Sequence, residues 1–267
     1  ASGIALAHTV PFLTAAAALR LSQSHWDTAG WGWTGLGLLI GSLAVLGLPK
    51  RYRISIAAPL VVGTVLAATS LLVSLGQLSQ AGISSILFAL VIVLLQVAPW
   101  IALAHIPVRI LDADTTEQIP AKGITDQVST SFVFVVALRA GGALAALFLA
   151  ISLMTAPVTR SVTLPLTLIM LGSVSLVLQT RSIRARVEVL LGALTGLIII
   201  LVSAVLGAYA DPMMMPWLTL SAIATALVLV VTNVVGPRAR PPLTRLADTI
   251  SVLSLFVLLP LAVYLWS

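Results

Sequence analysis

The sequence predicts an all-α protein, a polytopic membrane helix bundle with about nine transmembrane helices. Hydrophobic residues make up 60% of the 267 residues and charged residues only 8%, and the mean hydropathy is +1.15. This composition leaves too little polar surface to cover a soluble globule. Nine apolar stretches approach the roughly 20 residues that a helix needs to cross a bilayer core about 30 Å thick. Basic residues gather in alternate connections between these stretches.

The expected helices follow one another with mostly short connections, which makes consecutive helices antiparallel neighbours. In chain order they cover residues 4–19, 30–48, 54–75, 83–104, 131–154, 162–179, 187–209, 213–235 and 246–266. One connection, residues 105–130, is long. It separates a first group of four helices, within residues 1–104, from a second group of five, within residues 131–267.

The distribution of positive charge predicts the orientation of the chain. Of the 14 Lys and Arg residues, 11 lie in four connections that each follow an even-numbered helix. These are Lys50, Arg51 and Arg53, then Arg109 and Lys122, then Arg181, Arg184 and Arg186, then Arg238, Arg240 and Arg245. The intervening connections hold only Arg20 and Arg160. Because Lys and Arg are retained in the cytoplasm during insertion, we expect these four connections to be cytoplasmic and the C-terminus to lie outside.

The net charge of +6 does not indicate nucleic acid binding. The bases are spread over four connections next to the membrane, where insertion topology and anionic lipid headgroups explain them. Cysteine is absent, which excludes disulfides, thiol nucleophiles and thiolate metal sites. The chain starts at Ala1 without an initiator Met, and its first apolar stretch does not resemble a signal peptide. We therefore expect a longer protein whose missing part is cytoplasmic.

The long connection is the predicted partner-binding surface, because long loops in compact proteins are commonly functional. It holds half of the eight acidic residues together with basic ones. The candidate contact residues are Arg109, Asp112, Asp114, Glu117, Lys122 and Asp126. A solvated linker without a partner is the alternative that the sequence leaves open.

Small residues at four-residue spacing predict close helix contacts in lipid, because they let two backbones approach. The candidates are Gly37 and Gly41, Gly192 and Gly196, and Gly141 with its neighbours Ala137 and Ala145. This spacing does not identify the helix on the other side of the contact.

No catalytic or metal-binding pattern is found, so we expect neither an enzyme nor a cofactor. All eight acidic residues lie in connections or at helix ends, which argues against a carrier coupled to protons or sodium ions. His8, His25 and His105 lack the spacing of metal ligands. The three methionines at positions 213–215 are expected to make apolar contacts with lipid or a partner.

Arg139 is the one basic residue that the charge pattern does not explain, because it lies within the fifth helix. A charge there costs several kcal/mol unless it is paired or reaches water, so a functional role is one interpretation. We favour another, in which the helix crosses the membrane from about Arg139 onward and the side chain extends to cytoplasmic headgroups.

The grouping of four and five helices around a long cytoplasmic loop, together with the last helix, resembles the EccD family of actinobacterial type VII (ESX) secretion systems. Residues 236–248 lead through an Arg-x-x-Asp pattern, Arg245 to Asp248, into an apolar run broken by Pro260, which is similar to the terminal helix of that family. Ala98, Pro99 and Trp100 through Pro107 resemble the end of the family's sixth helix and the start of its long loop. The loop departs from the family pattern, because residues 105–127 lack a tight run of prolines.

The resemblance implies a non-catalytic membrane scaffold in the bacterial inner membrane. EccD proteins have eleven membrane helices and an N-terminal ubiquitin-like domain, so this chain would lack that domain and the first two helices. The implied partners are a second copy of the chain, membrane lipids, a membrane-anchored FtsK-like ATPase (EccC), and the EccB and EccE components. The implied exported substrates are helical-hairpin heterodimers of the WxG100 kind. From the residues alone, a secondary transporter of a small solute that uses Arg139, Gln96 and kinked helices remains the alternative.

Overall fold

The computed structural model describes the chain in ranges separated by gaps. These are residues 2–22, 28–47, 56–76, 79–104, 121–157, 162–179, 186–216 and 240–266, with the single residues 219 and 223. Helices and the turns at their ends make up these ranges, and no strand occurs in them. The all-helical prediction is therefore confirmed for the described part of the chain.

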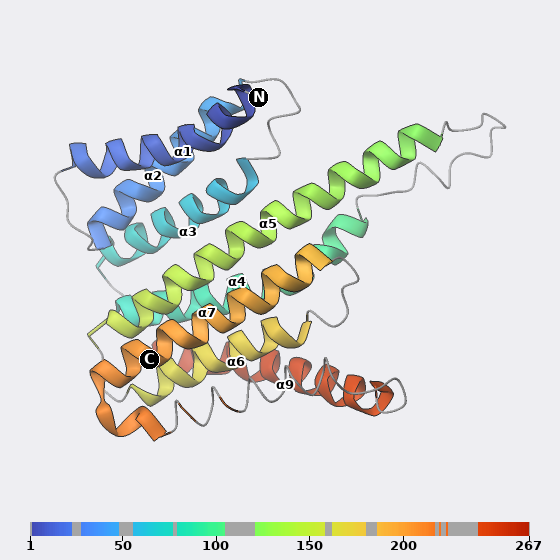
Figure 1. Ribbon diagram of the computed structural model, residues 1–267. Coiled ribbons are helices and arrows are strands. Elements are labelled where there is room, and N and C mark those ends of the chain that lie inside the picture. The colour runs from blue at the N-terminus through green and yellow to red at the C-terminus, as the bar shows by residue number, and fades with distance from the viewer. Residues whose placement is uncertain are drawn as a thin grey trace. The chain divides into compact units, whose positions relative to one another are not determined.

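The helices follow the predicted order (Figure 1). They are α1 (Ser2–Leu21), α2 (Thr28–Val45), α3 (Ala57–Ser74), α4 (Gln80–Ala104), α5 (Ala121–Thr155), α6 (Thr163–Gln179), α7 (Arg186–Ala210), the short 3-10 helix η4 (Pro212–Met214) and α9 (Arg240–Trp266). The eighth expected helix, residues 213–235, lies mostly outside the described residues. The number of nine membrane crossings therefore stays a prediction.

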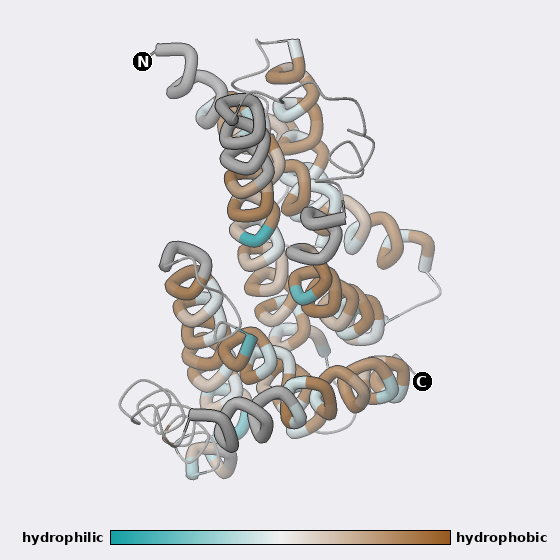
Figure 2. Tube along the Cα trace, turned by 90° about the vertical axis from the view of Figure 1, so that its right-hand side faces the viewer, coloured by the Kyte–Doolittle hydropathy of each residue, from teal (hydrophilic) through white to brown (hydrophobic). Residues whose placement is uncertain are grey.

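Four of the described helices are long and apolar enough to cross a membrane. They are Ala57–Ser74, Gln80–Ala98, Phe132–Thr155 and Val189–Ala210. Shorter apolar helices cover Thr9–Leu21, Thr163–Gln179 and Thr249–Leu265. Figure 2 shows that hydrophobic residues dominate along most of the coloured helices, as expected for helices surrounded by lipid or by one another.

Helix α5 corrects the predicted limits of the long connection. Residues 121–130 were expected in the loop, whereas the helix begins at Ala121 and continues without a break to Thr155. Its 35 residues correspond to a length of about 52 Å, which exceeds the bilayer core. Hydropathy marks only the apolar part of a helix, and backbone hydrogen bonding continues into the polar flank.

A left-handed glycine ends α3. Gly76 has a φ of 78°, and its N–H donates to the carbonyl oxygen of Val73 over 3.1 Å. Glycine adopts this conformation without the steric penalty that a Cβ brings, which is why it is common just past helix ends. Ser79 directly precedes α4, and its Oγ accepts a hydrogen bond from the N–H of Gly82 over 3.1 Å, which caps the helix.

The chain forms two compact units. Unit 1 contains residues 1–67 and 94–142, and unit 2 contains residues 68–93 and 143–267. The division passes through α3, α4 and α5, so each of these helices contributes to both units. The expected grouping of four helices before the long connection and five after it stays a prediction.

Unit 1 is built on the close pairing of α1 and α2, which lie side by side in Figure 1. Leu38 and Val45 of α2 are buried, as are Ile56 and Leu66 in and before α3. Val45 and Ile56 form a small core against which Val10 of α1 packs. The chain therefore gathers α1, α2 and α3 into one packed layer of helices.

Unit 2 is organised around α6, which packs against both α7 and α9 (Figure 1). Fully buried side chains come from five helices of this unit. They are Phe88 and Ile92 of α4, Leu149 and Leu153 of α5, Leu168 and Ile169 of α6, Ile199 of α7 and Leu258 of α9. Unit 2 therefore has a larger side-chain core than the core described for unit 1.

Candidate partner interface and helix contacts

The predicted partner-binding residues fall largely outside the described part of the chain. Arg109, Asp112, Asp114 and Glu117 are not among the described residues. Lys122 and Asp126 lie in the first turns of α5, where only the course of the helix is described. The charged connection therefore ends in a helix that continues directly into the membrane-spanning part of α5. Its role as a docking surface stays a prediction.

Gly37 and Gly41 of α2 lie against the backbone of α1. A Cβ at Gly37 would lie 2.5 Å from the Cα of Ala15, and a Cβ at Gly41 would lie 2.5 Å from the Cα of Pro11. Real Cβ atoms do not approach backbone atoms this closely. The Oγ1 of Thr14 also donates a hydrogen bond to the carbonyl oxygen of Gly37 over 2.7 Å. Backbone contact and an interhelical hydrogen bond thus hold α1 and α2 together.

A second face of α2 meets α3 in the same way. A Cβ at Gly35 would lie 2.6 Å from the backbone N of Ala67 and 2.8 Å from the carbonyl oxygen of Gly63. Neither Gly35 nor Gly63 was singled out from the sequence. The signal was present in the density of glycines from Gly30 to Gly41, but spacing alone cannot show that a helix has two contact faces.

Helix α5 packs against α3 and α4 within unit 1. A Cβ at Gly141 would lie 2.7 Å from the Cα of Ala58, and a Cβ at Gly142 would lie 2.6 Å from the Cδ2 of Leu95. Gly141 was a predicted packing residue, whereas Gly142 was not. Two adjacent glycines therefore face two different neighbouring helices, because successive helical positions point about 100° apart.

In unit 2, glycines face side chains as well as backbone. A Cβ at Gly196 of α7 would lie 2.5 Å from the Cγ2 of Val177 and 3.0 Å from the carbonyl oxygen of Ser173, both on α6. Gly192, one turn earlier on α7, is only half-buried. Gly172 of α6 was not predicted, and a Cβ there would lie 2.6 Å from the ring of Phe88.

A polar cluster that the sequence analysis missed joins α4 to α5 and α9. Ser84 and Ser152 share a hydrogen bond between their Oγ atoms over 2.7 Å, and the Nε2 of Gln80 donates to the Oγ of Ser152 over 3.2 Å. On a neighbouring face of α4, the Oγ of Ser85 donates to the carbonyl oxygen of Ala262 over 3.0 Å. The adjacent serines and the glutamine one turn before them were a detectable signal, because polar side chains hydrogen-bond across membrane helices.

Arg139 is buried in unit 1, with 6% of its surface exposed. It lies inside the apolar span Phe132–Thr155 of the continuous helix α5. This burial differs from the exposed position that an extension to lipid headgroups needs, and the role of Arg139 stays a prediction. On the same helix, α3 and α4 approach closely at the nearby Gly141 and Gly142.

Large apolar side chains are exposed on the outer faces of the helices. On α2 they are Trp33, Leu36, Ile40 and Leu43, and on α7 they are Leu190, Leu194, Ile198, Leu201 and Val205. Each set recurs at three- or four-residue intervals, which places it on one helix face. Faces of this kind suit lipid or another apolar helix as a neighbour.

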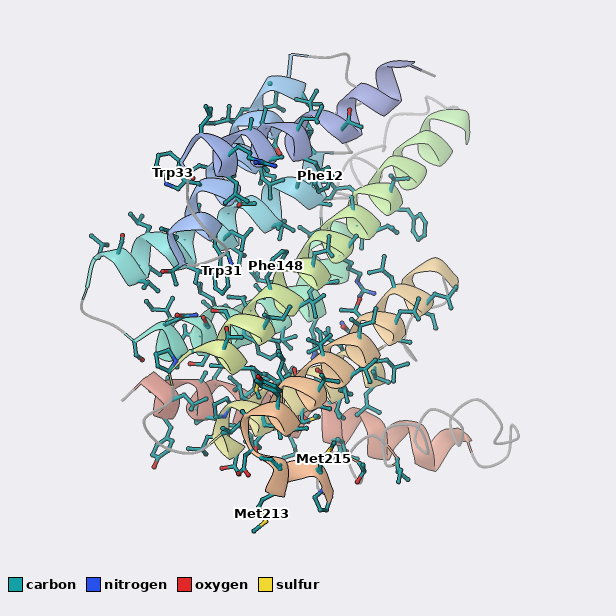
Figure 3. All side chains as sticks on the ribbon, turned by 60° about the vertical axis from the view of Figure 1, so that its left-hand side comes forward. Phe12, Trp31, Trp33, Phe148, Met213 and Met215 are labelled. Atoms are coloured by element: carbon teal, nitrogen blue, oxygen red, sulfur yellow. The ribbon has the colours of Figure 1, made fainter. Side chains whose placement is uncertain are left out.

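Met213, in the short helix η4 after α7, projects from the protein (Figure 3). Asp211 caps η4, because its Oδ1 accepts a hydrogen bond from the N–H of Met213 over 3.0 Å. Met213 is 83% exposed and Met215 more than half exposed. In the part of the chain that was searched, no group of three or more His, Cys, Asp or Glu residues could hold a metal ion.

Comparison with known proteins gives a consistent result. The family described as "EccD-like transmembrane domain" matches residues 1–267. Among solved structures, one similar chain comes from "Structure of protomer 1 of the ESX-3 core complex", with a TM-score of 0.71 and 18% sequence identity. The similarity covers 98% of the present chain and 62% of that chain. No curated protein matches.

Proposed function

The chain belongs to the family of EccD-like transmembrane domains, and from this membership we propose that it is a scaffold subunit of a type VII (ESX) protein secretion complex. The observation that carries the proposal is the family match over residues 1–267. The fold is similar to that of a chain in the ESX-3 core complex, which supports the same assignment. The chain would form part of the inner-membrane portion of the export machine.

A scaffold needs no reacting groups, and the helices fit this expectation. The sequence places every carboxylate in a connection or at a helix end. Apart from the buried Arg139, the side chains described with hydrogen bonds between helices carry hydroxyl or amide groups, as in the cluster of Gln80, Ser84 and Ser152. Such bonds hold helices in place in an apolar environment. The non-catalytic role rests on this arrangement.

The proposed orientation places the basic connections in the cytoplasm and the C-terminus outside. The chain has no cysteine, so a single introduced cysteine reports its own location without background. In intact cells stripped of their outer layers, a membrane-impermeant thiol reagent should label Tyr209→Cys, which is highly exposed at the end of α7. Asp114→Cys should be labelled only after the membrane is opened. Labelling of Asp114→Cys in intact cells would contradict this orientation.

Paired copies and the implied partners are tested by co-purification in mild detergent. Two copies with different tags should purify together, along with a membrane-anchored FtsK-like ATPase (EccC) and the EccB and EccE components. If the chain instead purifies as a lone monomer and transports a small solute in liposomes, the scaffold proposal is wrong.

The charged connection is the proposed contact for the ATPase. Replacement of Asp112, Asp114, Glu117 and Asp126 by their amides should remove the ATPase from the purified complex while the protein still inserts in the membrane. Asp211→Asn is the matched control, because it removes a carboxylate that directly follows α7, at the end of that helix expected to lie outside the cell. Equal loss of the ATPase in both variants would show that the connection is not a specific contact.

Substitution of Arg139 distinguishes the proposed scaffold function from the alternative of a solute transporter. Arg139→Leu removes the buried charge within α5. A scaffold should still pair and associate with its partners after this change, although its stability can shift. A carrier that uses Arg139 should lose solute uptake while keeping its assembly state. Loss of uptake with normal assembly would favour the transporter alternative.

A further inference from the structure

Helix α7 is the long apolar helix that the rest of the protein covers least. Of the four long apolar spans described, Val189–Ala210 has the highest hydropathy. Only 22% of its most apolar stretch is buried, against 61% for Gln80–Ala98 in α4. A helix that is strongly apolar and mostly uncovered by its own protein requires an apolar neighbour in place of water. That neighbour is either another helix or the hydrocarbon of the bilayer.

The buried side of α7 carries small residues. The buried positions between residues 189 and 210 are Gly196, Ile199, Ile200, Ser203 and Gly207. Three of these five residues are small, and a Cβ at Gly196 would lie 2.5 Å from the Cγ2 of Val177 on α6. The closest described contact of α7 with another helix is therefore made from this side, at a position without a side chain.

The exposed side of α7 carries large apolar residues instead. We define the outer face of α7 as residues Leu190, Leu194, Ile198, Leu201, Val205 and Tyr209, which are all exposed. Because successive residues turn by about 100°, these positions share one side of the helix, opposite Ser203. The one polar group of the face is the hydroxyl of Tyr209, at its end. Beside the face, the half-buried Thr195 donates its hydroxyl to the carbonyl oxygen of Leu191 in its own helix over 2.6 Å.

These side chains favour lipid over a second helix as the neighbour. Helix surfaces and acyl chains are equally apolar, so two helices associate in a bilayer where small residues let them approach or polar groups bond across the contact. The outer face of α7 offers neither along its apolar length. Acyl chains are flexible and can fill the spaces between branched side chains without a matching surface. The chemistry of this face therefore matches hydrocarbon.

The length of the outer face matches the thickness of a bilayer. From Leu190 to Tyr209 the helix rises about 28 Å, and the hydrocarbon core of a bilayer is about 30 Å thick. Tyr209 is 92% exposed, and tyrosine is common at the depth of the headgroups, where its ring meets hydrocarbon and its hydroxyl meets water. At the other end, the charged residues Arg186 and Glu188 precede the face in the sequence. Polar residues therefore delimit the face at both ends.

We propose that the outer face of α7 is a lipid-contact surface, bound by phospholipid acyl chains in the single chain and in its assembled complex. Tyr209 then lies at the headgroups, and Ile198 and Leu201 lie near the middle of the bilayer. The inference goes beyond the scaffold function, because it states which face the subunits of a complex leave to lipid. A second copy, another subunit and another segment of this chain are the competing neighbours.

Spin labels on single cysteines test the proposal, since the chain has no cysteine of its own. The labelled protein, purified with its associated subunits, is placed in nanodiscs of phosphatidylethanolamine and phosphatidylglycerol. Oxygen concentrates in hydrocarbon, whereas a water-soluble nickel chelate stays outside it. Collision of the label with oxygen should be highest at Ile198→Cys and Leu201→Cys. It should fall several times toward Leu190→Cys and Tyr209→Cys, and collision with nickel should show the opposite order.

Ile199→Cys is the matched control for Ile198→Cys. The two positions carry the same residue at nearly the same depth, but Ile199 has no exposed surface and Ile198 is 45% exposed. The label at Ile198 should therefore collide with oxygen several times more often than the label at Ile199. If the label at Ile199 prevents folding, the profile along the outer face decides alone, since it needs no label at a buried position.

Infrequent collision with both oxygen and nickel at Ile198 and Leu201 would overturn the proposal, because a protein neighbour excludes both reagents. Magnetic broadening between labels that disappears on dilution with the cysteine-free chain would identify that neighbour as a second copy. The same low collision rates without broadening would identify another subunit or another segment of this chain.

Truncation of the outer face gives an independent test. Leu194→Ala, Ile198→Ala and Leu201→Ala together should leave co-purification of a second copy or another subunit unchanged, because acyl chains fill the vacated space. Loss of a partner that the unaltered chain retains would also overturn the proposal. The oxygen profile is measured on the protein in lipid and does not depend on secretion. Failure of this inference is therefore distinguishable from failure of the proposed scaffold function.

Discussion

The two compact units hold their helices together by different means. In unit 1, helix backbones touch, as Gly37 does at Ala15 and Gly141 does at Ala58. In unit 2, a large side chain fills the contact, since the ring of Phe88 faces Gly172. Hydroxyl groups form bonds between helices in both units, as Thr14 does in unit 1 and Ser84 with Ser152 does in unit 2. Lipid is as apolar as the helix surfaces, so only close packing and polar bonds can favour helix association in either unit. The difference predicts how each unit responds to an added or a removed methyl group.

Removal of the ring at Phe88 should have the largest effect. Phe88 has no exposed surface, and its loss leaves a cavity between α4 and α6. We expect Phe88→Ala to lower the free energy of unfolding by about 3 kcal/mol, at the lower end of the range for buried Phe, because part of the transfer energy from water is absent in lipid. Thermal denaturation in detergent measures it. Leu90→Ala, at a more exposed site on α4, is the control. An equal loss of stability in both variants would contradict the view that the buried ring of Phe88 stabilises the helix contact in unit 2.

Addition of a methyl group at Gly37 should come next. The obstructing atoms belong to the backbone of Thr14 and Ala15, which cannot move aside without separating α1 from α2. We expect Gly37→Ala to cost about 2 kcal/mol of stability. Gly47→Ala is a matched control, because the nearest atom to its Cβ is 3.4 Å away and belongs to its own chain turn. If Gly37→Ala leaves the free energy of unfolding unchanged, α1 and α2 are not in the close backbone contact described here.

A glycine-to-alanine substitution should cost less stability at Gly172 than at Gly37. The two costs together compare a side-chain contact with a backbone contact. Here the Cβ meets the rim of the Phe88 ring and the Cγ1 of Ile92, and side chains can rotate where a backbone cannot. We expect Gly172→Ala to cost about 1 kcal/mol, roughly half the effect at Gly37. Parallel thermal melts of the two variants give the ratio. A larger loss at Gly172 would reverse the assignment of rigid and adjustable contacts.

Removal of the hydroxyl at Ser152 should have the smallest effect. Ser152→Ala breaks the bonds to Ser84 and to the side chain of Gln80, but the methyl group keeps the packing. Hydrogen bonds between membrane helices average about 0.6 kcal/mol, so the loss should be close to that value. A double-mutant cycle with Ser84→Ala measures the coupling. Zero coupling would mean that side-chain packing alone stabilises this contact.

Much of the fold was readable from apolar length and charge. The expected helices at residues 30–48, 54–75 and 83–104 correspond to α2, α3 and α4 with small shifts at the ends. The limits of α5 were not readable, because a polar helical extension has no hydropathy signal. The resemblance to the EccD family rested on topology and the terminal helix, and the family match over residues 1–267 confirms it.

Only some of the helix contacts could be predicted from the sequence. The four-residue spacing drew attention to Gly37 and Gly41, which do lie against α1, but it missed Gly35 and Gly172. A pattern of glycines shows that one face of a helix lacks side chains. It cannot show which neighbouring helix packs against that face. Arg139 illustrates the same limit, because its burial depends on the tertiary packing around α5 and not on its own sequence position.

The sequence by itself determined that this chain is a bundle of apolar helices whose charges lie outside the apolar runs, apart from Arg139. The physical reason is the bilayer, which demands apolar side chains and internally satisfied backbones whatever the packing. Only the tertiary structure decided which faces meet, which serines bond and where Arg139 is covered. Any apolar face is compatible with lipid, so the choice among faces depends on shape and on hydrogen-bond geometry, which linear sequence does not display.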